Sequence, residues 1–104
     1  MDTEATAQAQ GANGGPKVIR ATQFILEDET GKRRAELTMS KDGPGLCLFD
    51  ENGKRRAWLA VRRDAPWLYL ADETGKDRVR LSVGKEGPRL ILKDETGKVI
   101  RSQP

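Results

Sequence analysis

The chain has 104 residues, enough for one small domain, and 34% of them are charged. Its net charge of +3 is too small to indicate a nucleic-acid partner by itself. There is no histidine, the commonest general base and metal ligand, and the single cysteine, Cys47, cannot form an internal disulfide. No apolar run approaches the ~18 residues of a transmembrane helix, and no secretory leader is present, so we expect a cytoplasmic protein without membrane insertion.

Residues 1–16 are mainly Ala, Gln, Gly, Thr and Asn, with no large apolar side chain after Met1. Such a segment cannot bury enough surface to offset the entropy lost on ordering. The sequence therefore predicts a flexible N-terminal tail over 1–16 and a β-repeat domain over 17–104.

The domain is built from a 22-residue repeat. The segment DETGK at 28–32 recurs in the same or closely similar form at 50–54, 72–76 and 94–98, without insertion. A fixed period of this length is typical of repeat architectures. Within each repeat, apolar side chains recur every second residue, which indicates two short strands with one buried face.

Stacking the repeats aligns the apolar side chains in columns that should face inward together. The columns are Phe24, Leu46, Leu68 and Leu90; Leu26, Leu48, Leu70 and Leu92; Ala35, Ala57 and Val79; Leu37, Leu59 and Leu81; and Met39, Val61 and Val83.

Two kinds of turn connect these strands. The three segments with Thr-Gly predict four-residue hairpin loops, and Asn52-Gly53 in the second segment is a signal for a two-residue loop. In each turn we expect the glycine at positive φ and the first aspartate bonded to backbone N–H groups. An even loop length keeps the apolar residues of both strands on one face. The second connection is marked by Pro44, Pro66 and Pro88, which favour turns over central strand positions.

These features predict an all-β fold, an antiparallel up-and-down meander of about eight strands, as a closed barrel or a self-associating sheet. A two-sheeted β-solenoid is the alternative. One open sheet would leave its apolar face in water, so the sheet must close, fold over or meet another copy. Arg101 ends one inward column with a charge, which is costly in a sealed barrel and tolerable at an edge. We therefore expect a homo-oligomer, with a different protein partner as a further possibility.

The opposite face carries aromatic side chains among arginines. Cys47 and Trp58 should be cross-strand neighbours there, as should Phe49 and Arg56. One interpretation is cross-strand packing or self-association. The other is a platform that stacks bases or sugars and contacts phosphates of a nucleic acid or glycan. The candidate binding surface consists of Arg55, Arg56, Trp58, Arg62, Arg63, Trp67 and Tyr69.

No motif indicates catalysis or a cofactor. The paired acids of each turn are followed by lysine and lack the alternating acids of a calcium loop, so we expect no metal. Cys47 and the serines have no histidine to activate them. We expect no enzyme, no catalytic residue and no cofactor.

The pattern F/L-x-L-x-D-E-x-G-K-x-R-A-x-L-x-V, then D-G-P, resembles tandem D-x-x-G-K-x-R-A-x-L repeats of uncharacterised bacterial proteins, often preceded by an anchor or coiled coil. The resemblance runs from Val18 to about Arg101 and implies a bacterial origin and a stalk or display role, so a surface location stays open. A more distant similarity is to YD-type repeats of bacterial shell proteins. The resulting hypothesis is a non-enzymatic structural or protein-interaction module; the alternative is a module that binds an anionic polymer.

Overall fold

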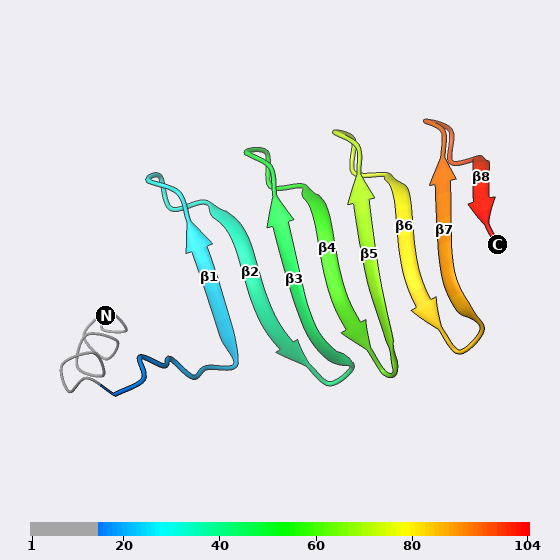
Figure 1. Ribbon diagram of the computed structural model, residues 1–104. Helices are drawn as coiled ribbons and strands as arrows, with labels where there is room; N and C mark the ends of the chain where they lie inside the picture. The colour runs from blue at the N-terminus through cyan, green and yellow to red at the C-terminus, as the bar shows by residue number, and fades with distance from the viewer. Residues whose placement is uncertain (1–14) are drawn as a thin grey trace.

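The computed structural model describes residues 15–104, so the predicted tail lies outside the described residues except for Gly15 and Pro16. Eight antiparallel strands follow one another in chain order within one sheet (Figure 1). Their bounds are β1 Gln23–Glu27, β2 Arg33–Ser40, β3 Gly43–Phe49, β4 Arg55–Arg62, β5 Ala65–Ala71, β6 Asp77–Gly84, β7 Gly87–Lys93 and β8 Val99–Gln103.

The predicted all-β meander is confirmed, and the sheet is not closed. β1 and β8 lie at opposite edges, so the barrel form of the prediction is wrong (Figure 1). The solenoid alternative is also wrong, because each strand pairs with its neighbour in sequence rather than with the equivalent strand of the next repeat. The radius of gyration is 17.5 Å, well above the ~13 Å of a compact 100-residue domain. The described chain is therefore a single-layered plate.

The acidic turns contain three-residue loops, which corrects both the four-residue loops predicted for the Thr-Gly segments and the two-residue loop indicated by Asn52-Gly53. Gly31 N–H donates to the Asp28 carbonyl over 2.9 Å, and Asp28 N–H donates to the Lys32 carbonyl over the same distance. The glycines have positive φ as predicted, 90° at Gly31. A β-bulge at Arg34 follows, since Leu26 pairs with Ala35 but Glu27 with Arg33. The odd loop and the extra residue together keep both strands facing the same way.

The turns at the other end of the sheet are two-residue loops. Gly43 and Gly87 follow two of them with φ of 131° and 111°. The middle loop has Ala65 at this position, and there the positive φ, 60°, falls on Arg63. Gly43 also lies so close to β4 that a Cβ at this position would overlap the Val61 carbonyl oxygen.

The predicted apolar columns share one face, which we call the leucine face, but this face is not buried within the chain. Leu59 is 50% exposed, Leu48 46% and Leu81 42%. Among the described residues only Ala60 is buried. It lies on the opposite face, beside Trp67 and next to Gly45, which Trp58 covers. The expected core is therefore a bare surface, and the best-packed region lies on the other side.

Candidate functional site

The leucine face is an unbroken apolar surface. Its middle row runs from β1 to β7 through direct cross-strand pairs, each leucine opposite the next. The members of this row are Phe24, Leu37, Leu46, Leu59, Leu68, Leu81 and Leu90. The parallel row nearer the acidic turns ends at β8 with Arg101, which pairs with Leu92 and is exposed. The charge predicted at the end of an inward column therefore lies at the rim of the sheet.

The opposite face, which we call the aromatic face, is centred on three rings. Trp58 and Tyr69 are cross-strand partners with ring centroids 5.1 Å apart and planes at 17°. Trp67 stacks on Tyr69 at 5.9 Å and 3°. The first pair joins β4 to β5, whereas Trp67 and Tyr69 both lie on β5. Stacked ring pairs are stabilising beyond the area they bury. Cys47 pairs with Trp58, as predicted.

Guanidinium groups lie over these rings. Arg55 and Arg62, from the two ends of β4, lie 4.6 and 5.0 Å from the Trp58 ring. Arg80 lies 5.3 Å from the Tyr69 ring. The aromatic face therefore supplies cations for its own rings.

Of the predicted binding residues, five contact one another in this cluster, Arg56 lines the same hollow as Arg55 and Tyr69, and Arg63 lies apart. The five are Arg55, Trp58, Arg62, Trp67 and Tyr69. Arg63 sits in the tip of the β4–β5 turn, where its N–H donates to the Asp42 carbonyl. Arg56 is a bulge residue, and Phe49 pairs with Arg55 in its place, which corrects the predicted Phe49–Arg56 contact.

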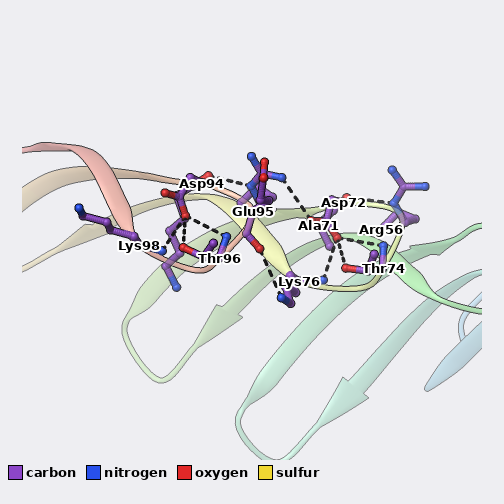
Figure 2. A network of polar contacts seen from close by, with 11 residues as sticks. Arg56, Ala71, Asp72, Thr74, Lys76, Asp94, Glu95, Thr96 and Lys98 are labelled. Carbon is purple, nitrogen blue, oxygen red and sulfur yellow. Dashed lines mark hydrogen bonds and ion pairs between the residues drawn. The ribbon is translucent and has the colours of Figure 1, made fainter.

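The bulge arginines tie each repeat to the next. The Nε of Arg34, Arg56 and Arg78 donates to a carbonyl of the neighbouring strand, at Phe49, Ala71 and Lys93 respectively. The distances are 3.2, 2.9 and 2.7 Å. Figure 2 shows the Arg56–Ala71 bond beside the next turn. The three guanidinium groups also approach the first aspartate of their own turn, at 3.6, 3.5 and 3.3 Å. Arg56 is thus a structural clamp.

The turn aspartates are bound as predicted (Figure 2). Asp72 Oδ1 accepts from the Thr74 hydroxyl at 2.7 Å and from the N–H groups of Thr74 and Lys76. The Thr74 bond is the main cause that lowers the pKa of Asp72 well below its ordinary range. The equivalent bond from Thr30 is the main cause that lowers the pKa of Asp28 from 3.8 to about 2, with the N–H groups of Lys32 and Thr30 adding to it. These carboxylates are occupied in shaping the turns.

The predicted binding surface left out Arg80 and Arg33, although the guanidinium groups of both lie over rings of the aromatic face. Arg33 lies 4.2 Å from the Phe49 ring and pairs with Glu36 at 2.9 Å. Arg80 occupies the column of Trp58, and its cross-strand partner is Tyr69. That column was the signal that could have identified Arg80. Arg33 reaches the Phe49 ring only because of the three-residue loop and the bulge, and no residue pattern in the sequence predicts these two features.

The described residues contain no cluster of three or more His, Cys, Asp or Glu side chains placed to hold a metal ion. Over 15–104 no helix is long and apolar enough to cross a membrane.

Comparison with known proteins gives no family model that matches the chain and no significant match to a curated protein. The resemblance to bacterial tandem-repeat proteins stays a prediction.

Proposed function

We propose that this chain is a non-enzymatic structural module that assembles with other copies through its leucine face. The observation that carries the proposal is the exposure of that face, where Leu37, Leu59 and Leu70 are 45%, 50% and 40% exposed. Soluble monomers rarely expose contiguous apolar patches beyond a few hundred Å². Partner strands lie on both sides of β2 to β7, so between the two edge strands the uncovered surface is the side-chain layer itself.

The aromatic face supports this proposal by contrast. A polyanion-binding platform needs free ring faces and unpaired cations. Here Arg55 and Arg62 lie over Trp58, Arg80 over Tyr69, and Arg80 also pairs with Asp77 at 3.1 Å. These contacts fit cross-strand packing of a water-facing layer better than a binding platform.

Light scattering at micromolar concentration tests the proposal. We expect the unaltered chain to be larger than one chain mass. Leu59→Glu should make it monomeric, because the new carboxylate would have to be buried unpaired in the interface. Ser102→Glu adds the same charge at an exposed β8 position, opposite Ile91 on the aromatic side, and should leave the assembly intact.

An unaltered chain that is strictly monomeric would overturn the proposal. So would an assembly that Leu59→Glu leaves unchanged. Circular dichroism of both variants controls for loss of fold.

A further inference from the structure

The row of the leucine face nearest the acidic turns alternates between large and small side chains. The odd strands carry leucines and the even strands carry smaller residues, paired directly across the sheet. The row reads Leu26, Ala35, Leu48, Ala57, Leu70, Val79 and Leu92. Leu26, Leu48 and Leu70 are exposed, whereas Leu92 is half-buried, as are the smaller Ala35, Ala57 and Val79. The row therefore forms ridges about two strand spacings apart, or ~10 Å, with grooves between them.

We propose that two copies pack leucine face to leucine face, with the ridges of each copy in the grooves of the other. This arrangement rests on the proposed function and specifies its partner, one second copy of this chain. In this arrangement the two-fold axis would run parallel to the strands and pass between β4 and β5, which lie at the centre of the sheet (Figure 1).

The even number of strands makes this arrangement self-complementary. A sheet turned over about that axis has its strand order reversed, so β4 lies over β5 of the second copy, β3 over β6 and β2 over β7. Every odd strand then faces an even one. Leu70 meets Ala57 of the second copy, Leu48 meets Val79 and Leu92 meets Ala35. In the middle row, where each of these strands carries a large side chain, Leu59 meets Leu68, so the alternating row sets the fit between the two sheets.

The buried area suits a stable dimer. Eight strands at ~4.8 Å spacing and three rows of side chains at ~6.6 Å give roughly 700 Å² per copy, close to the ~800 Å² per partner of standard interfaces. The face carries no charge from Phe24 to Leu92, and Arg101 falls on the rim over β1 of the second copy. The aromatic faces then point outward, with guanidinium groups of the same chain over their rings, so this packing leaves no leucine face for a third copy.

The test exchanges a ridge with a groove. Ala35→Leu fills a groove on β2, and Leu92→Ala removes the ridge that should occupy it. Within one chain β2 and β7 are separated by four strands, so the two sites are ~24 Å apart. Sites that far apart are expected to act independently. In the proposed dimer they face each other, so the double exchange restores the fit through the second copy.

Dimer dissociation constants are measured by sedimentation. Ala35→Leu should weaken the dimer at least about tenfold, through overpacking in two symmetric grooves. Addition of Leu92→Ala should return the constant to within about threefold of the original. Ala57→Leu is the matched control: it fills a groove that faces Leu70, so Leu92→Ala should not rescue it.

Rescue of Ala35→Leu alone supports the arrangement. A double variant no tighter than Ala35→Leu, or equal rescue of Ala57→Leu, overturns it. If assembly depends on Leu59 but shows no such rescue, only this arrangement fails. A monomeric unaltered chain overturns the proposed function as well.

Discussion

The two faces of the sheet differ in how far one chain can satisfy them. On the aromatic face, rings stack across strands, guanidinium groups cover them, and Ala60 is buried. On the leucine face, large apolar side chains such as Leu48 and Leu59 are about half exposed to water. A hydrophobic row thus does not make a core by itself, because a single layer has nothing to pack against. Side-chain contacts on the aromatic face link neighbouring strands within one chain, and the leucine face remains uncovered.

The largest expected effect is the loss of stability in a Leu59 variant, which tests whether the leucine face is buried in the assembled protein. In the assembled protein Leu59→Ala should cost about 2–5 kcal/mol per chain, as for a buried side chain. On dilution below the dissociation constant, the cost should fall below about 1 kcal/mol, since Leu59 is 50% exposed in one chain. Denaturant unfolding at two protein concentrations checks this. An equal cost at both concentrations would mean that no second copy covers the face.

Gly43 tests whether backbone geometry keeps the single layer in shape. Gly87→Ala should cost about 1–3 kcal/mol through strain at positive φ alone. Gly43→Ala should cost a further ~1–3 kcal/mol, because the new methyl group would overlap the Val61 carbonyl on β4. Denaturant midpoints should rank the two variants in this order. Equal costs would show that β3 and β4 can separate at this end without penalty.

The aromatic face should contribute independently of assembly. We expect the Trp58–Tyr69 pair to show a coupling of about 0.5–1.5 kcal/mol in a double-mutant cycle to alanine. The coupling should be the same at all protein concentrations, because both rings contact each other within one chain. A coupling that appears only in the assembled protein would mean that the copies meet through the aromatic face and not through the leucine face.

The smallest expected effect is the loss of folding stability at acid pH. The folded-state pKa of Asp28 is about 2, below its ordinary 3.8, and the pKa of Asp72, Asp50 and Asp94 is lowered too. The stability that these carboxylates contribute is therefore present above about pH 4 and lost as pH falls toward 2. Asp72→Asn should flatten this part of the stability curve. If the stability of the variant falls as steeply with pH as that of the unaltered chain, the Asp72 carboxylate does not contribute to the acid dependence.

Much of the fold could be predicted from the sequence, and the reason is its repetition. The 22-residue period and the spacing of residues such as Leu46 and Leu48 predicted the number and facing of the strands, and the turn residues favoured sequential pairing over a solenoid. Loop length could not be predicted, because an even loop and an odd loop with a bulge at Arg34 give the same facing. The role of Arg56 was missed for the same reason, since only the bulge directs its Nε to the Ala71 carbonyl. Whether the sheet closes into a barrel could not be predicted. The alternation of apolar and polar residues shows which side chains share a face, but not what covers that face.

Hydroxyl-radical labelling of the neighbours Trp58 and Leu59 tests the central claim most directly. They lie side by side on β4 and point to opposite faces. Raising the protein concentration from nanomolar to micromolar should reduce labelling of Leu59 several-fold while labelling of Trp58 stays constant. Labelling of Leu59 that does not change, or protection of Trp58 instead, would contradict assembly through the leucine face.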